Sequence, residues 1–168
     1  MTLKLYLDSG ILIACYAKKD IDPLYKKDRH IEVIKILKAT KESNQKIRLY
    51  ISNWAILETI RVLVKVKNFD ELKVNNWING IISTQSLLKN ELILLRFSKD
   101  YYIDNLFQDI KKALLTSKEK VHTGDIINVI CMKKHKINKI LTFNDKDYSG
   151  FSNIYPYNPF KTSIKKSN

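Results

Sequence analysis

Glycine, proline and cysteine are scarce in this chain of 168 residues, which contains 4, 3 and 2 of them respectively. So few turn-forming residues exclude a loop-rich architecture, and helices with short connections should dominate. The two cysteines, Cys15 and Cys131, form neither a CxxC pair nor a disulfide framework. Each lies among apolar residues, where a thiol acts as a small hydrophobic side chain. Together they indicate a reducing compartment.

Long hydrophobic runs are also missing, because no stretch approaches the roughly 18 uncharged apolar residues that cross a bilayer. The apolar amino-terminal segment is interrupted by Lys4 and Asp8, which makes it a poor signal peptide. With 45% hydrophobic and 28% charged residues, the composition is typical of a globular domain. We therefore expect a cytoplasmic protein with one domain over residues 1–160 and a flexible basic tail at 161–168.

Acidic residues are the minority among the charges. Lys and Arg number 30 and Asp and Glu 17, which gives a net charge of +13. Such an excess attracts polyanions, so nucleic acid, an anionic membrane surface and an acidic protein remain open as partners. A general bias of the chain towards lysine is the simpler alternative. The candidate nucleic-acid contacts are the cations Lys18, Lys19, Lys133 and Lys134 and the aromatic Tyr148.

Short apolar runs alternate with longer amphipathic segments. The expected strands span residues 3–7, 49–51, 92–97 and 139–143, with 154–155 as a short edge strand. The expected helices span residues 9–17, 23–43, 54–64, 69–89 and 100–115, and a last helix, which Thr123 can cap, ends near 133–136. Pro23 and Ser52 are expected to open their helices. This alternation predicts an α/β fold, a three-layer α/β/α sandwich with a central, mainly parallel sheet of four to five short strands.

Four acidic residues should converge at one edge of that sheet. Asp8 ends the first strand, Asp145 follows the fourth, Asp125 opens a helix, and Glu58 lies almost two turns into another. Ligands of such sheets bind beyond the carboxyl ends of the strands. Clustered carboxylates repel one another, and a bound divalent cation relieves that repulsion.

Each of these acids except Asp8 also has a simpler structural explanation. Asp125 suits a helix N-terminus, Glu58 can pair with Arg61 on the same helix face, and Asp145 suits a turn. An acid that closes a buried apolar strand has no comparable structural purpose. The four residues as a set therefore favour a cation site more strongly than any one of them does.

Three segments carry a family resemblance: LYLDSG at 5–10, ISNWAILETIRVL at 51–63 and HTGDIINVICMKKHKINKILTFNDKDYSGF at 122–151. Taken in order, they resemble the PIN-domain (PilT N-terminus) nucleases, including the VapC-like toxins. The resemblance implies a catalytic and metal-binding set composed of Asp8, Glu58, Asp125 and Asp145. It also implies Ser9 and Asn144 as supporting polar groups. Asp147 is a further acid, and the choice between Asp145 and Asp147 as the fourth acid stays open.

The same resemblance implies an endoribonuclease that depends on Mg²⁺ or Mn²⁺. Small single-domain members of the family look like toxins of type II toxin–antitoxin pairs, which form homodimers and are blocked by a small antitoxin protein. The alternatives are an RNA-processing PIN nuclease without an antitoxin, a catalytically inert PIN scaffold, and a non-catalytic basic nucleic-acid-binding module. A haloacid-dehalogenase-like phosphatase is disfavoured because Gly10 stands where its second Asp is needed, and no phosphate-binding glycine motif is present.

Overall fold

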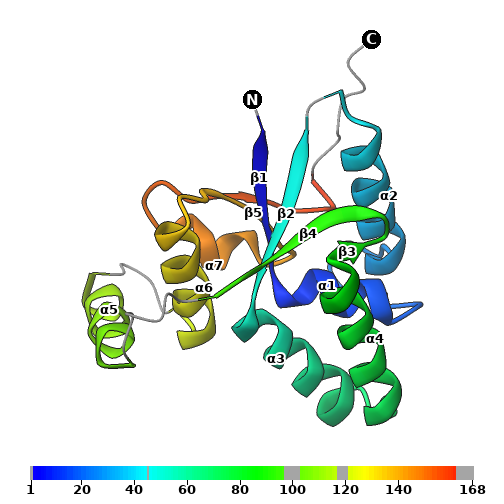
Figure 1. Cartoon of the computed structure of the whole chain (residues 1–168), viewed down its shortest axis with the longest axis horizontal. Coiled ribbons are helices and arrows are strands. Elements are labelled where there is room, and N and C mark those ends of the chain that lie inside the picture. Colours follow the sequence, from blue (N-terminus) through cyan, green and yellow to red (C-terminus); the bar gives the residue numbers. More distant parts are fainter. Residues whose placement is uncertain (1, 45, 97–102, 117–120, 162–168) are drawn as a thin grey trace.

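A six-stranded sheet with helices on both faces forms the body of the protein (Figure 1). The structure is a computed structural model that describes residues 2–44, 46–96, 103–116 and 121–161. The strands are β1 (Leu3–Leu7), β2 (Ile47–Ser52), β3 (Ser86–Leu87), β4 (Asn90–Leu95), β5 (Lys139–Leu141) and β6 (Tyr155–Tyr157). Their order is β3-β4-β2-β1-β5-β6, and every pair is parallel except β3 with β4. The expected mainly parallel α/β/α sandwich is confirmed. The two-residue strand β3, too short to stand out in the sequence, brings the number of strands above the expected four to five.

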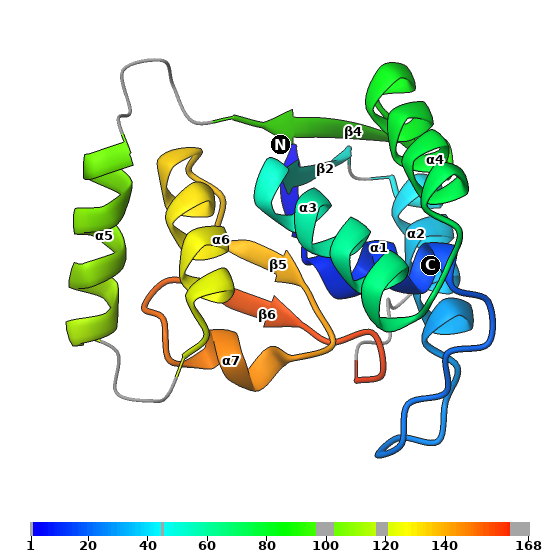
Figure 2. The same cartoon turned by 90° about the horizontal axis from the view of Figure 1, so that it is seen from below.

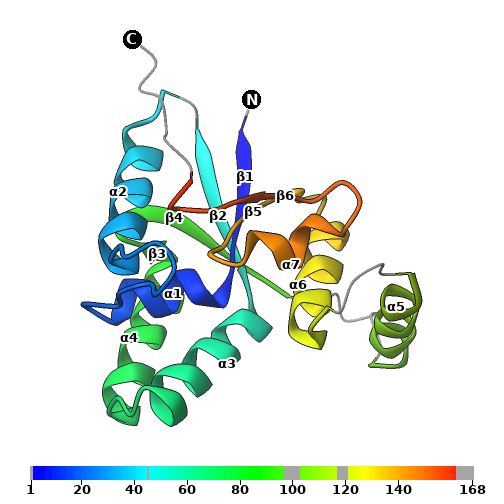
Figure 3. The same ribbon diagram turned by 180° about the vertical axis from the view of Figure 1, so that it is seen from behind.

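The strand residues alternate between two cores, because successive side chains of a strand point to opposite faces. Leu5 and Leu7 of β1 lie in one core, and Tyr6 between them lies in the other. The helices are α1 (Ser9–Tyr16), α2 (Arg29–Glu42), α3 (Asn53–Arg61), α4 (Glu71–Thr84), α5 (Ile103–Thr116), α6 (Thr123–Lys134) and α7 (Asp145–Ser149). Helices α1 to α4 cover the first core, and α6 and α7 cover the second (Figures 2 and 3). Helix α5 packs against α6 at the outside of the molecule.

The order of the strands creates a switch point beside β1. From β1 the chain adds β2 and then β4 on one side, and it later returns to add β5 and β6 on the other side. The crevice beyond the carboxyl ends of β1 and β5 is therefore where a ligand site is expected in an open parallel sheet. Asp8 and Thr142 follow these two strands directly, and the backbone N–H of Asp8 donates to the Leu141 carbonyl at 3.1 Å.

Two of the expected helix starts are wrong, and one is confirmed. Ser52 caps α3, because its hydroxyl accepts a hydrogen bond from the Ala55 N–H at 3.1 Å. Pro23 does not open a helix: it lies in a loop closed by a bridge between Ile21 and Asp28, and Asp28 caps α2 through the His30 N–H. Thr123 is the first residue of α6 and not its cap. His122 occupies the cap position, without a side-chain hydrogen bond to the helix.

Several elements differ in length from the expected ones. The helix expected over 54–64 ends at Arg61 and continues as the π-helix η1 (Val62–Val66). The helix expected over 69–89 ends at Thr84, because Gln85 adopts a left-handed conformation (φ 47°) and reverses the chain into β3. Helix α7 was not expected at all, since its five residues are too few to show a periodic pattern.

Neither a membrane span nor a disulfide appears within the described ranges. None of their helices is both long enough and apolar enough to cross a bilayer. Cys15 and Cys131 are free thiols, the first half-buried and the second buried. Burial raises the pKa of Cys15 to about 12 and that of Cys131 to about 11, so both remain protonated at neutral pH. This is the behaviour of small hydrophobic side chains, as the sequence indicated.

The left-handed cap of α4 gives a test of the fold. A left-handed conformation costs a residue with a Cβ about 1–2 kcal/mol, and Gln85 is exposed. Gln85→Gly removes that strain but loosens the unfolded chain, so we expect the free energy of unfolding to rise by about 0.5–1 kcal/mol. Urea denaturation measures the change. The matched control is Asn76→Gly in the middle of the same helix, which should lower stability by a similar amount; a loss of stability in both variants would contradict the proposed turn.

Candidate active site

Asp8 is a buried carboxylate held at both oxygens. Its residue is 6% exposed, at the point where β1 passes into α1. The Ser9 N–H donates to Oδ1 at 2.9 Å, and the Thr142 hydroxyl donates to Oδ2 at 2.7 Å. Ser9 itself is buried. Residues far apart in the sequence therefore fix the orientation of this carboxylate.

Thr142 connects Asp8 to the turn that follows β5. Its hydroxyl donates to Asp8 and accepts a hydrogen bond from the Asn144 N–H at 3.0 Å. Its own backbone N–H donates to the Tyr157 carbonyl at 3.0 Å, which ties the turn to β6. Asn144 supports the site through this backbone contact, while its residue is exposed.

The hydroxyl of Tyr148 joins Asp8 to Asp125. Tyr148, on α7, is fully buried, and its oxygen lies 3.0 Å from Oδ1 of Asp125 and 3.3 Å from Oδ1 of Asp8. The side-chain amide of Asn128 donates to the same hydroxyl at 3.2 Å. Asn128 in turn accepts from Tyr6 at 2.6 Å. Because the hydroxyl has one proton, it cannot fully satisfy both carboxylates when both are charged.

The surroundings of Asp8 disfavour its charged form. Burial raises its pKa from 3.8 to about 6. The hydrogen bond from Thr142 opposes this shift, and the charges of Asp125 and Glu58 add to it. A buried carboxyl whose like-charged neighbours raise its pKa is typical of a functional site.

The pKa of Asp125 shows that two further acidic residues lie near Asp8 and Asp125. Its pKa is raised by burial, lowered by the hydrogen bond from Tyr148, and raised again by the charges of Asp147 and Glu58. His122 lies close enough to lower it slightly. Glu58 and Asp147 are both half-buried. We define the acidic cluster as Asp8, Glu58, Asp125 and Asp147.

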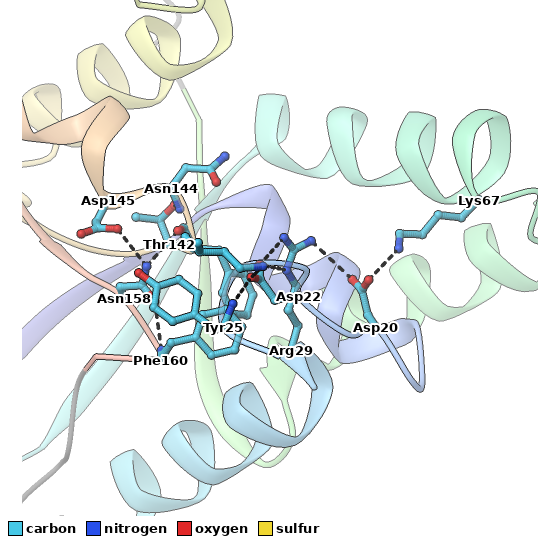
Figure 4. A network of polar contacts seen from close by, with 12 residues as sticks. Asp20, Asp22, Tyr25, Arg29, Lys67, Thr142, Asn144, Asp145, Asn158 and Phe160 are labelled. Atoms are coloured by element: carbon cyan, nitrogen blue, oxygen red, sulfur yellow. Dashed lines mark hydrogen bonds and ion pairs between the residues drawn. The ribbon is translucent and has the colours of Figure 1, made fainter. Parts of the chain in front are cut away.

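Asp145 is engaged elsewhere, as Figure 4 shows. The side-chain amide of Asn158 donates to its Oδ1 at 2.8 Å, and the ammonium of Lys161 donates to its Oδ2 at 2.7 Å. Partial burial alone would raise the pKa of Asp145, but these two partners hold it below its ordinary value. The structure therefore gives the carboxylate of Asp145 a cationic partner, whereas the charge of Asp147 acts on Asp125 and raises its pKa. Residues 162–168 of the expected tail lie outside the described residues.

Asn158 was not anticipated from the sequence. It is 3% exposed, follows β6, and donates to the Phe143 carbonyl at 2.9 Å as well as to Asp145. The next aromatic residue, Phe160, stacks on Tyr25 and contacts the ring of Phe143. The only sequence signal was a polar residue directly after the last strand, which is too common to identify such a role.

An ion-pair network fixes the other side of the same turn (Figure 4). Arg29 lies over the ring of Phe143 at 5.3 Å and donates to Asp22 at 2.6 Å. Asp20 accepts from Lys67 at 3.2 Å and lies 3.8 Å from Arg29. The turn after β5 is thus held between the carboxyl-terminal segment and the loop before α2, and with it Thr142.

The predicted nucleic-acid contacts are not gathered at the acidic cluster. Lys133 and Lys134 lie at the opposite end of α6 from Asp125, about 12 Å or more along its axis, and Lys134 pairs with Asp109. Lys18 and Lys19 are exposed in the loop after α1. For Tyr148, the prediction of base stacking is wrong, because a fully buried ring cannot contact a base.

The acidic cluster fits a hard divalent cation. Mg²⁺ typically binds proteins through one or two carboxylates and retains several waters. Asp8 and Asp125 supply two carboxylates around one hydroxyl. Across the ranges that the structure describes, no three His, Cys, Asp or Glu side chains are grouped so that they could hold a metal ion. The donor set therefore suits a partly hydrated Mg²⁺ or Mn²⁺ and not a cation fully enclosed by protein.

The parallel sheet, with carboxylates at its switch point, is the fold of a PIN domain. No family model and no curated protein matches the sequence. Among solved structures, the chain is similar to VapC20 of Mycobacterium tuberculosis, described as a toxin that cleaves the sarcin–ricin loop. The TM-score is 0.55 at 11% identity, and the match covers 88% of this chain and 96% of VapC20. The protein thus has a VapC-like PIN fold.

The burial of Asp8 predicts a pH-dependent instability of the metal-free protein. Its folded-state pKa of about 6 exceeds the ordinary 3.8, so the folded state binds this proton more tightly than the unfolded state does. Stability from this group is then full below pH 4 and is lost as the pH rises to about 6, by at most about 3 kcal/mol. In EDTA, the unfolding free energy of Asp8→Asn should increase relative to wild type across that window.

The matched control is Glu42→Gln at the exposed end of α2, whose difference from wild type should stay constant with pH. A difference between Asp8→Asn and wild type that is equally flat would contradict the buried, charge-repelled environment of Asp8.

Proposed function

We propose that this protein is a divalent-metal-dependent endoribonuclease and the toxin of a type II toxin–antitoxin pair. The observation that carries the proposal is the pair of carboxylates, Asp8 and Asp125, joined by one buried hydroxyl at the switch point of a PIN fold. The likeness to VapC20, itself an RNA-cleaving toxin, supports the same reading. The proposed metal is Mg²⁺ or Mn²⁺, and the proposed compartment is the cytoplasm.

The residues at the acidic cluster divide into three pairs. Asp8 and Asp125 would hold the cation, and Glu58 and Asp147 would bind it or orient its water. Tyr148 and Thr142 keep the two central carboxylates in place. When bound, the cation lowers the pKa of a water and stabilises charge on the phosphate oxygens. The protein itself positions the phosphodiester and excludes bulk water from the buried side of Asp8.

The excess of positive charge supports RNA as the substrate class. A net charge of +13 draws a polyanion to the surface, and a cation held at the acidic cluster would offset the repulsion between its carboxylates and the scissile phosphate. A small antitoxin protein and a homodimer complete the proposal. A neighbouring gene for a short DNA-binding protein would identify the antitoxin.

The proposed reaction predicts a specific set of inactive variants. Purified wild type should cleave single-stranded RNA with Mg²⁺ or Mn²⁺ and stop in EDTA. Asp8→Asn and Asp147→Asn should each lower the cleavage rate by about 100-fold or more, because each loses a cation-binding charge. Asp145→Asn should cleave within a few-fold of wild type, because its carboxylate is paired with Lys161. Gel assays on a labelled oligonucleotide measure all four rates.

These variants also separate the competing assignments. Loss of cleavage in Asp145→Asn with retention in Asp147→Asn would make Asp145 the fourth acid. If wild type binds RNA but does not cut it in the presence of any divalent cation, the protein is a nucleic-acid-binding module instead.

Cation binding itself can be measured without cleavage. A ligand that binds only the folded state stabilises it, by about 2.7 kcal/mol at 100 times its dissociation constant. Mn²⁺ should therefore raise the melting temperature of wild type and of Glu42→Gln but not of Asp8→Asn. KCl at matched ionic strength is the control for general screening. An equal rise in Asp8→Asn would place the cation elsewhere.

A further inference from the structure

Trp54 is an exposed aromatic residue beside the acidic cluster. It is the second residue of α3 and is 40% exposed, although its neighbours Ala55 and Ile56 are buried. Trp54 and Glu58 are four residues apart, so they lie one turn apart on the same face of the helix. The indole is therefore adjacent in position to one of the proposed cation-binding acids.

A glycine brings the indole to a second acid. A Cβ built on Gly124 would lie 3.1 Å from Nε1 of Trp54, tighter than most real Cβ contacts, so the indole would have to shift by a few tenths of an ångström. Gly124 is in the first turn of α6 and directly precedes Asp125, and α3 packs against α6 (Figure 2). Glycine inside a helix costs about 0.5–1 kcal/mol relative to alanine, and its φ here is not positive. The glycine is thus explained by the space that the indole occupies.

Beyond Trp54, helix α3 carries an exposed apolar residue and then a cationic one. Leu57, 61% exposed, is three residues after Trp54, and Arg61 is one turn beyond Leu57. An indole fixed along one edge by the backbone and open on the other side is a rigid stacking surface. Stacking of a nucleobase on such a ring contributes about 1–3 kcal/mol and requires a base that is not paired in a duplex.

We propose that Trp54 stacks on an unpaired nucleobase next to the phosphate bound at the acidic cluster. The ligand class is single-stranded or looped-out RNA. This subsite rests on the proposed function for its ligand, but binding can be measured separately from cleavage.

A fluorescence titration tests the stacking directly. The chain has two tryptophans, and Trp77 of α4 packs against Tyr16 of α1, so the Trp77→Phe variant reports Trp54 alone. With Ca²⁺ in place of Mg²⁺ and the RNA checked for intactness, a single-stranded octanucleotide should quench this fluorescence, and a duplex of the same sequence should quench it far less. Absence of quenching at saturation would overturn the subsite.

Substitutions then give the contribution of the ring. Trp54→Ala should weaken RNA binding by about 5- to 100-fold and raise KM more than it lowers kcat. Trp54→Phe should restore most of the affinity. Gly124→Ala should weaken binding in the same direction, because its Cβ displaces the indole although alanine favours the helix. The matched control is Leu72→Ala, which removes an exposed apolar side chain from a different helix, α4, and should behave as wild type.

The outcomes distinguish the subsite from the proposed function. Cleavage by wild type with unchanged affinity and KM in Trp54→Ala overturns the subsite and leaves the nuclease intact. Quenching by RNA without cleavage in any divalent cation supports the subsite and overturns the nuclease. If Trp54→Ala dissociates a dimer, measured by sedimentation, and leaves RNA affinity unchanged, the indole belongs to a protein interface and the subsite is overturned.

Discussion

The structure depends on a buried carboxylate, Asp8, packed beside a second one, Asp125, with a single tyrosine hydroxyl between them. One proton serves two acceptors, so the arrangement is electrostatically incomplete. Three further hydrogen bonds fix the arrangement. Thr142 and Ser9 donate to Asp8, and Asn128 donates to the tyrosine hydroxyl. Within the described part of this lysine- and arginine-rich chain, neither carboxylate has a cationic side chain among its hydrogen-bond partners. The proposed cation would remove this deficit of positive charge.

The topology explains why these residues meet. Strand β1 lies between β2 and β5, and the chain reverses its direction of growth across the sheet at β1. A switch point of this kind is where open parallel sheets bind their ligands, beyond the carboxyl ends of the strands. Asp8 follows the first strand at this edge, and Thr142 follows the fifth. Helices α3, α6 and α7 add Glu58, Asp125 and Tyr148 from the surrounding ends.

The sequence predicted the parts that follow from local pattern. Asp8 was recognised because it closes an apolar strand, and Ser52 because a hydroxyl precedes an amphipathic helix. Choosing between Asp145 and Asp147 was beyond the sequence, because residues two apart on a helix point about 200° apart and the direction depends on Asn158 and Lys161, which follow a later strand.

Aromatic residues were equally ambiguous. The sequence does not tell which aromatic side chain is buried: Tyr148, among polar residues, is fully buried, whereas Trp54, followed by apolar residues, is 40% exposed. The loop at Pro23 was misjudged for a related reason. Asp22 accepts hydrogen bonds from the Leu24 and Tyr25 N–H groups and stabilises a turn where proline would otherwise begin a helix.

The long sequence separation of the contacts to Asp8 also governs when the site can form during synthesis. Thr142 and Tyr148 follow Asp8 by 134 and 140 residues, and the turn between them also depends on Asn158 and Lys161, which lie still later in the chain. A ribosome that has translated the first strand, and even the first four helices, carries a nascent chain without the partners that orient this carboxylate. The hydrogen bonds that orient Asp8 and link it to Asp125 are therefore complete only after the last strands have been added to the sheet.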